Sequence, residues 1–353
     1  MIVALQRLIF VLSEFLRAPL DALRGISRRS YVISADVAAP KSVTWAVMSA
    51  HKIRLEGNPP IDIDAAPVPS RPGIYSGSIA FSSEKADQAT VADNGIEGVL
   101  DLVDMPVPDL YSAELSLFVL NAGIRLLETV RPEVMYLSLS DWIQHKYAPG
   151  EPEANRFYGT LDMCFGRLDA LGAVVALTAD HGMNDKSRPD GSPNVIWLQD
   201  ILDARLGRGT TRVICPITDS FIAHHGALGG FVRVWCFEGT EPAQVMAVAR
   251  ELPGIERVLD KETAVREFNL PSDREGDVIV IGDHLTCIGT TEADHDLAYL
   301  KGRRLRSHGA VAESRVPFLL NRRLTEEYAV RAATCGIRNY EVFDYAINGT
   351  VSS

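Results

Sequence analysis

The chain has 353 residues, enough for one large α/β domain or two ordinary ones, and its hydrophobic content of 46% can fill a sizeable core. Its net charge of -11 at pH 7 repels phosphate backbones and anionic lipids, which argues against a nucleic-acid partner or a membrane partner. Its five cysteines are widely spaced and form no CxxC motif. This pattern argues against a disulfide framework and a structural zinc knuckle, and it favours a reducing cytoplasm.

The first twenty residues, MIVALQRLIFVLSEFLRAPL, are apolar enough to resemble a signal peptide, but charged residues interrupt them and no small-residue cleavage site follows. We expect an amphipathic helix there, with one apolar face made by Leu5, Leu8, Ile9, Leu12, Phe15 and Leu16. Residues 20 to 76 show no sustained period of two or 3.6. We therefore interpret residues 1–78 as an irregular amino-terminal region.

Helical and extended patterns alternate from about residue 95 onward, as in a mostly parallel sheet covered by helices. Ser112 is placed to cap a helix whose apolar face contains Leu115, Phe118, Val119, Ala122 and Leu126. A strand follows at 133–139, a second helix begins near Pro152 and stops at Gly172, and a second strand spans 173–179. A right-handed crossover would make the two strands parallel.

Side chains that can bind metals follow both strands: Asp141 and His145 after the first, Asp180 and His181 after the second. The carboxyl ends of parallel strands share one edge, and open α/β sheets bind ligands at that edge. Aspartate and histidine supply the oxygen and nitrogen ligands that zinc accepts. Each residue alone has a simpler interpretation, as a helix cap or an ordinary histidine. The set of four favours a metal site.

The spacing of these residues limits how they can share an ion. Asp141 and His145 are four residues apart, so they point the same way if the segment forms one helical turn. Asp180 and His181 are consecutive, so their side chains diverge unless the chain bends after them, and they hold either one metal or two neighbouring ones. His308, in the loop sequence RSHGA, is a further candidate ligand.

The rest of the chain indicates an insert followed by more of the core. Turns and short apolar pieces at 186–231 predict an insert that caps the site edge. The patterns at 231–238 and 277–283 predict strands, and residues 242–254 predict a helix. We therefore assign residues 79–185 and 232–353 to the metal-binding α/β core. The remaining histidines fall into two groups: surface or core residues (His51, His284 and His295) and residues of the cap or of a substrate contact (His224 and His225).

Three motifs in order carry a resemblance to a known family: SDWIQHKYAPG at 140–150, LTADHGMND at 177–185 and RSHG at 306–309. They resemble the metal-binding motifs of the alkaline phosphatase superfamily. Further stretches between about residues 79 and 345 are similar to its phosphonoacetate hydrolase family, among them FSSEKADQAT, PNVIWLQDIL, ITDSFIAHHGALGGF and VPFLLNRRL.

The resemblance implies an α/β/α sandwich, with a mostly parallel central sheet and an inserted cap, that uses two zinc ions to hydrolyse phosphonoacetate to acetate and phosphate. It implies that Asp141, His145 and His308 bind one zinc, and that Asp180 and His181 are part of the ligand set of the other. Manganese and iron are alternative metals. The implied partner is a small phosphonate substrate. Alternative functions are another phosphodiesterase or phosphatase of the superfamily, and a non-catalytic metal-binding remnant.

Part of the family pattern has no match. The family's nucleophilic threonine and the metal aspartate after its first strand precede the stretch that FLRAP, 15–19, resembles. Its AKDK-like motif, whose lysines bind the substrate carboxylate, is absent from residues 20–78, and a translated frameshift is one hypothesis for that region. We therefore expect an incomplete amino-terminal part, an unidentified nucleophile and little activity. A missing central strand would leave sheet edges that favour pairing into a homo-oligomer.

Overall fold

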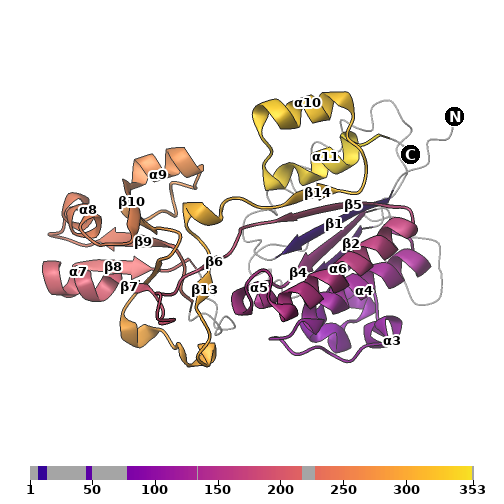
Figure 1. The fold of residues 1–353 in the computed structure, drawn as a ribbon, viewed down its shortest axis with the longest axis horizontal. Helices are drawn as coiled ribbons and strands as arrows, with labels where there is room; N and C mark the ends of the chain where they lie inside the picture. The colour runs from indigo at the N-terminus through magenta and orange to yellow at the C-terminus, as the bar shows by residue number, and fades with distance from the viewer. Residues whose placement is uncertain (1–6, 14–44, 50–77, 133, 217–226, 352–353) are drawn as a thin grey trace. The chain divides into compact units, whose positions relative to one another are not determined.

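The computed structural model describes residues 7–13, 45–49, 78–132, 134–216 and 227–351. The chain divides into two units. Figure 1 shows the ribbon, coloured continuously from the N-terminus to the C-terminus. The first unit consists of Met1–Ile143, Gly150–Asp180 and Val316–Ser353, and the second of Gln144–Pro149 and His181–Arg315. No helix within the described ranges is long and apolar enough to cross a membrane.

The first unit is built on a six-stranded sheet with the order β14-β5-β1-β4-β2-β3. Its strands are β1 (Arg7–Ser13), β2 (Trp45–Ser49), β3 (Ser78–Ser82), β4 (Val134–Leu139), β5 (Ala173–Ala179) and β14 (Phe318–Leu320). Neighbouring strands are parallel except for β14, which runs antiparallel to β5 at one edge. The predicted mostly parallel sheet is confirmed.

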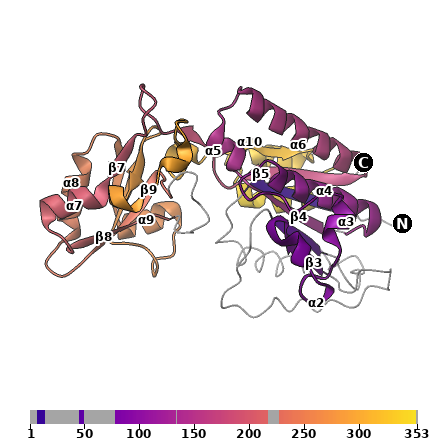
Figure 2. The ribbon, with the colours of Figure 1, turned by 90° about the horizontal axis from the view of Figure 1, so that it is seen from below.

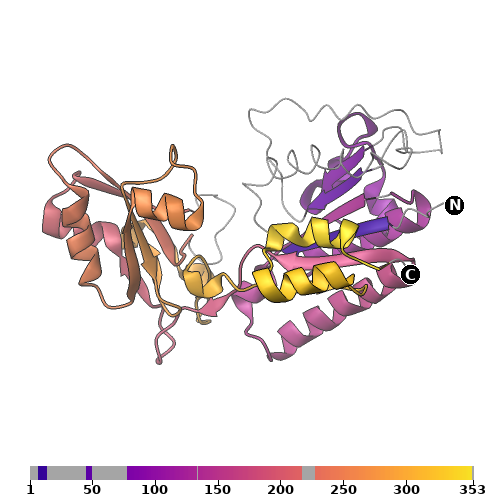
Figure 3. The same ribbon diagram turned by 90° about the horizontal axis from the view of Figure 1, so that it is seen from above.

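Helices cover both faces of this sheet. The helices of the first unit are α2 (Val91–Asn94), α3 (Val99–Val103), α4 (Glu114–Thr129), α6 (Pro152–Ala170), α10 (Glu326–Cys335) and α11 (Val342–Asn348), with 3-10 turns at Ser83–Gln88 and Asn339–Glu341. Figure 1 shows α4 and α6 on one side of the sheet and α10 and α11 on the other, and Figure 3 shows α10 and α11, in yellow, lying over the sheet. The unit therefore has three layers, in agreement with the predicted α/β/α sandwich.

The apolar face predicted for α4 forms much of the buried core. Leu115, Phe118, Val119, Ala122 and Leu126 all have no exposed surface. The predicted cap is wrong, because the helix begins after Ala113 and makes no side-chain capping bond. The hydroxyl of Ser112 instead donates to the carbonyl of Asp109 within the preceding turn.

The second predicted helix has the predicted ends. Pro152 occupies its first turn, where a missing N–H leaves no hydrogen bond unmade. Gly172 follows the helix with a φ of +84°, a conformation that residues with a Cβ rarely adopt. The opposite face of the sheet is covered by α11, where Val342 and Ala346 pack against Val174 and Ala176 of β5.

The carboxyl ends of β4 and β5 lie level with each other. β1 lies between them, and its last residue, Ser13, is the register partner of both Leu139 and Ala179. Asp141 follows β4 by two residues, and Asp180 follows β5 directly. Because both strands run in the same direction, both aspartates leave the sheet at the same edge.

The amino-terminal helix predicted around residues 5–16 is wrong, because residues 7–13 form strand β1. An apolar run of this length fits a buried strand as well as a helix, and pairing with β4 and β5 decides between them. The expectation of a missing central strand is wrong for the same reason. Strand β2 also falls inside the region predicted to be irregular, and the rest of residues 14–77 lies outside the described residues.

The second unit contains a four-stranded antiparallel sheet with the order β10-β11-β9-β8. Its strands are β8 (Thr211–Ile214), β9 (Phe231–Cys236), β10 (Ile255–Asp260) and β11 (Val278–Gly282). Two short pairs accompany it, β6 (Asn184–Asp185) with β13 (Arg306–Ser307) and β7 (Val195–Trp197) with β12 (Cys287–Gly289). Its helices, seen in Figure 2, are α7 (Leu198–Leu206), α8 (Pro242–Arg250) and α9 (Lys261–Phe268), with 3-10 turns at Glu292–Asp294, Ala298–Leu300 and Val311–Glu313.

Strand β11 supplies apolar side chains to both faces of the second sheet. Val278 and Val280 pack in the cluster formed with α7 and α8. Ile279 and Ile281 pack on the other face, against α9 and Ala310. Both faces of the strand are therefore buried. The contact with Ala310 holds the loop that follows His308 against the core of the second unit.

The unit boundaries differ from the predicted segments. The insert predicted at 186–231 lies inside a unit that runs from His181 to Arg315, and it contains α7 and β8 as well as turns. Residues 232–315, which the sequence pattern led us to assign to the core, belong to the same second unit. The predicted strands at 231–238 and 277–283 and the helix at 242–254 are confirmed as elements. Hydrophobic periodicity identifies a strand but does not say which sheet it joins.

Candidate metal centre

The two candidate aspartates lie at the carboxyl edge of the first sheet. Since β1 separates β4 from β5, these two strands are about 10 Å apart, twice the usual spacing. Ser116 of α4 fixes the chain just before Asp141, because its hydroxyl accepts from the amide of Ser140 at 2.9 Å and donates to the carbonyl of Ser140 at 3.3 Å. Asp141 itself is buried, with 5% of its surface exposed.

His145 lies on α5 (Trp142–Lys146), a helix of five residues that begins directly after Asp141, so the predicted helical turn is present. Its Nδ1 lies 2.8 Å from the carbonyl oxygen of Arg306, and the Nε of Arg306 donates back to the carbonyl of Gln144 at 2.8 Å. A carbonyl only accepts, so Nδ1 is the donor in this contact and Nε2 is the potential ligand atom. This is the arrangement in which histidines usually bind metals.

His181 has the same arrangement. Its Nδ1 lies 2.9 Å from the carbonyl oxygen of Gly182, which again makes Nδ1 the donor and Nε2 the potential ligand atom. In both His145 and His181, the Nδ1 hydrogen bond to a carbonyl makes Nε2 the potential ligand atom.

Three imidazole rings gather in the second unit. The rings of His181 and His308 are stacked, with centroids 3.5 Å apart and planes 9° apart. The ring of His145 lies 5.4 Å from that of His308 at an angle of 57°. His308 follows strand β13, whose pairing with β6 brings its loop beside the segment that follows His181.

Asp141, His181 and His308 make up a donor set of one carboxylate and two imidazoles that could hold a metal ion. Oxygen and nitrogen donors of this kind suit divalent first-row metals. Together with the Nδ1 hydrogen bonds of His145 and His181, this donor chemistry fits a metal centre.

Positive charge is concentrated just after His145. Burial lowers the pKa of Lys146, and the positive charges of Arg303 and Lys301 lower it further. The guanidinium of Arg303 lies over the ring of Tyr147, 4.7 Å from its centroid. These cations create a local positive potential on a chain of negative net charge, which favours an anionic ligand.

The other histidines divide as the sequence indicated where the structure describes them. His284 is exposed. The Nε2 of His295 accepts from the amide of Thr290 at 2.9 Å, and its ring stacks on Trp197, so it has a structural role. His51, His224 and His225 lie outside the described residues.

Sequence reasoning missed a buried ion pair beside these histidines. Lys186 and Glu313 both have fully buried side chains, and their charged atoms are 2.9 Å apart. Lysine is usually a surface residue, so nothing in its sequence position suggested burial. Its place five residues after His181, in a motif rich in ligands, is the one signal that could have drawn attention to it.

Residues 75–310 match the model of the family described as type I phosphodiesterase / nucleotide pyrophosphatase. The match covers more than half of the chain, so the chain belongs to this family, which is part of the alkaline phosphatase superfamily.

Two crystal structures of phosphonoacetate hydrolase from Sinorhizobium meliloti 1021 are similar to this chain over most of its length. The complex with phosphonoformate is 42% identical, with a TM-score of 0.76, and the match covers 88% of this chain and 71% of that chain. The complex with phosphonoacetate is 40% identical, with a TM-score of 0.75 and the same coverage. The resemblance inferred from the three motifs is confirmed, and by family the chain is a phosphoester hydrolase.

Proposed function

We propose that this protein is a zinc-dependent hydrolase that cleaves the carbon–phosphorus bond of phosphonoacetate. Water supplies the oxygen of the new phosphorus–oxygen bond and the proton of the new carbon–hydrogen bond, so the products are phosphate and acetate. The observation that carries the proposal is the 40% identity, over 88% of the chain, to an enzyme solved with phosphonoacetate. The donor chemistry of the site supports it.

The proposed ligands are the five residues that the motifs identify. Asp141, His145 and His308 would hold one ion, and Asp180 and His181 would belong to the ligand set of a second. In two-metal sites the ions lie about 3.5–4 Å apart, so ligands of different ions can be direct neighbours, as the stacked rings of His181 and His308 are. The bound ions would neutralise the phosphonate and polarise its phosphorus.

The substrate carries a phosphonate and a carboxylate. The positive charges of Lys146, Lys301 and Arg303 favour such an anion near His145. The leaving group is carbanion-like, and the carboxylate of the substrate can delocalise that charge before the carbon is protonated.

We also propose that the 353-residue polypeptide turns over slowly. The matching motifs supply five metal ligands but no residue in the role of the family's nucleophilic threonine. Loss of a nucleophile from a metal-assisted site lowers the rate by orders of magnitude, even when the metal ligands remain.

A second candidate is hydrolysis of a phosphodiester or phosphomonoester. The name of the matching family favours it, since that name refers to phosphodiesterases and pyrophosphatases. A non-catalytic metal-binding role is the third candidate, and it would require bound metal without turnover of any of these substrates.

Phosphorus and proton NMR of the purified, zinc-loaded chain, together with its zinc content, distinguish the three candidates. Phosphonoacetate, an aryl phosphodiester and an aryl phosphomonoester are supplied in parallel, with and without a chelator. Slow release of phosphate from phosphonoacetate, matched by acetate and abolished by the chelator, is the expected result. Faster cleavage of an ester would favour the second candidate, and metal binding without turnover the third. Turnover like that of an intact enzyme would contradict the proposed impairment.

We also propose that the protein works in the cytoplasm. All five cysteines are free, which is consistent with a reducing cytoplasm. The proposed partner is a small phosphonate, and self-association is tested by sedimentation equilibrium of the purified chain.

A further inference from the structure

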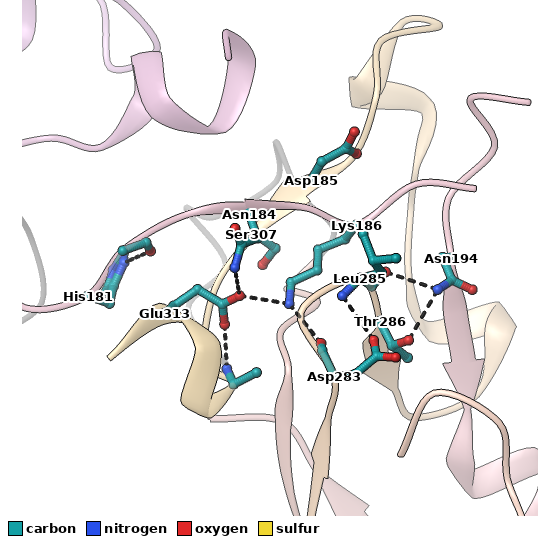
Figure 4. A network of polar contacts seen from close by, with 12 residues as sticks. His181, Asn184, Asp185, Lys186, Asn194, Asp283, Leu285, Thr286, Ser307 and Glu313 are labelled. Atoms are coloured by element: carbon teal, nitrogen blue, oxygen red, sulfur yellow. Dashed lines mark hydrogen bonds and ion pairs between the residues drawn. The ribbon is translucent and has the colours of Figure 1, made fainter. Parts of the chain in front are cut away.

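The carboxylate of Glu313 is the centre of a buried polar network, shown in Figure 4. Its Oε1 accepts from the Nζ of Lys186 at 2.9 Å and from the side-chain amide of Asn184 at 2.6 Å. Its Oε2 accepts from the amide of Ala310 at 2.7 Å. One side chain therefore connects the segment after His181 with the loop after His308.

A backbone hydrogen bond also connects the segment after His181 with the loop after His308. The amide of Gly182 donates to the carbonyl of Glu313 at 2.6 Å. A Cβ added at Gly182 would lie 3.2 Å from the carbonyl oxygens of Glu313 and Arg315, so the two segments are packed closely. Gly182 is next to His181, so this contact restricts where the imidazole can lie.

The loop of His308 is held from its other side as well. The amide of Gly230 donates to the carbonyl of His308 at 2.8 Å, and Gly309 has a φ of +106°. With Ala310 bonded to Glu313, the backbone from His308 to Ala310 is held at both of its ends. The stacked arrangement of His181 and His308 is the result.

The charges in this network are unusual for a structural core. The side chains of Lys186 and Glu313 have no exposed surface, and Lys186 also donates to the carbonyl of Asp283 at 3.2 Å. A buried ion pair of this kind often stabilises a protein no more than an apolar pair of similar volume. Its geometric effect, fixing two segments in one register, therefore accounts better for its presence.

We propose that Lys186 and Glu313 are positioning residues for the metal centre: they hold the segments of His181 and His308 so that both imidazoles face the metal centre. This inference rests on the proposed metal site. It assigns a role to two residues that do not themselves bind the metal. Loss of a residue that orients a metal ligand typically lowers metal affinity 10- to 100-fold.

The test measures zinc affinity and thermal unfolding of the full chain for five variants. Glu313→Gln and Lys186→Met each break the ion pair. The double variant Lys186→Met with Glu313→Leu replaces the pair by apolar side chains and should recover thermal stability. Glu251→Gln is the matched control, because it breaks the exposed pair of Arg205 and Glu251 in the same unit. Asn184→Ala removes one bond to Glu313 and leaves the ion pair in place.

Positioning predicts zinc affinity 10- to 100-fold weaker in both single variants and in the double variant, even where thermal stability has recovered. Asn184→Ala should show a smaller loss, and Glu251→Gln none. If a single variant does not fold, the double variant and Asn184→Ala decide the question. Unchanged zinc affinity in these folded variants would overturn the positioning role alone. Failure of the unaltered chain to bind zinc would overturn both this inference and the proposed function.

Discussion

The imidazole rings of His181 and His308 are stacked 3.5 Å apart, although 126 residues separate them in the chain. Both rings are presented by short connections rather than by long helices or strands. Their arrangement therefore depends on the contacts that fix those connections: the pairing of β6 with β13, the buried carboxylate of Glu313, and the close approach of Gly230 to the loop of His308. Mutations at these contacts should affect metal binding without removing a ligand.

Gly230→Ala should weaken zinc binding. A Cβ at this position would lie 2.6 Å from the Cβ of Ala310 and 2.7 Å from its amide nitrogen, so the loop that follows His308 would have to move. We expect zinc affinity at least 10-fold lower, measured by competition with a chromogenic chelator. Gly166→Ala is the control, because a Cβ there meets nothing within 4 Å on helix α6. An equal affinity for the two variants would show that the loop tolerates the displacement.

Lys186→Met should destabilise the second unit strongly. It leaves the carboxylate of Glu313 buried without its cation, which costs about 3–5 kcal/mol when a buried pair loses one partner. Urea unfolding monitored by tryptophan fluorescence gives the free energy of unfolding. Arg205→Gln breaks an exposed pair, with side chains 48% and 63% exposed, and should cost about 0–1 kcal/mol. A loss of less than 1 kcal/mol for Lys186→Met would contradict the buried charge assignment.

Asp260→Ala should destabilise the start of α9 at neutral pH and have less effect in acid. The Oδ1 of Asp260 accepts from the amide of Thr263 at 2.8 Å, and this cap is worth about 1 kcal/mol. The hydrogen bonds from the Thr263 backbone and side chain hold the pKa of Asp260 below its ordinary value. A lowered pKa adds stability above the unfolded-state pKa, and this stability is lost as the pH falls through the folded-state pKa.

The measurement is urea unfolding of the unaltered chain and of Asp260→Ala between pH 7 and about 3.5, just below the ordinary pKa of aspartate. The difference between the two chains should begin to shrink below about pH 5. A difference that stays constant over this range would show that the charge of Asp260 has no part in the cap.

Zinc should raise the stability of the folded chain, since the proposed ligands converge only after folding. At a free zinc concentration 100 times the Kd, one site that binds only the folded state adds about 2.7 kcal/mol. Thermal unfolding with zinc and with a chelator measures the effect. Magnesium is the control, because it prefers oxygen ligands and should bind this set weakly. An identical Tm with zinc and with the chelator would argue against a metal centre.

Sequence predicted well those elements whose local pattern fits only one kind of secondary structure. The apolar face of α4, the proline that begins α6 and the glycine that follows it each indicate a helix with a defined end. The run AVVALTA at 173–179 and the pattern at 133–139 predicted two strands, and the helix between them predicted that the strands run parallel. Because parallel strands share a carboxyl edge, this also placed Asp141 and Asp180 at one edge.

The features that sequence missed depend on contacts between distant segments. Residues 7–13 carry an apolar run that fits a helix or a strand, and only pairing within the sheet decides. Strands β9 and β11 look like strands of the first sheet, yet they form a separate antiparallel sheet. The burial of Lys186 follows from Glu313, which is 127 residues away, and no local pattern contains that information.

X-ray absorption at the zinc edge, on the purified chain and on His308→Ala, shows whether the chain binds zinc and whether His308 is one of the ligands. We expect zinc bound by nitrogen and oxygen at about 2.0–2.1 Å, with the scattering typical of imidazole, and a clear loss of bound zinc in the variant. His284→Ala, which changes an exposed histidine, should bind zinc like the unaltered chain. A chain that retains no zinc, or one whose zinc site is the same in His308→Ala, would contradict the proposed metal centre.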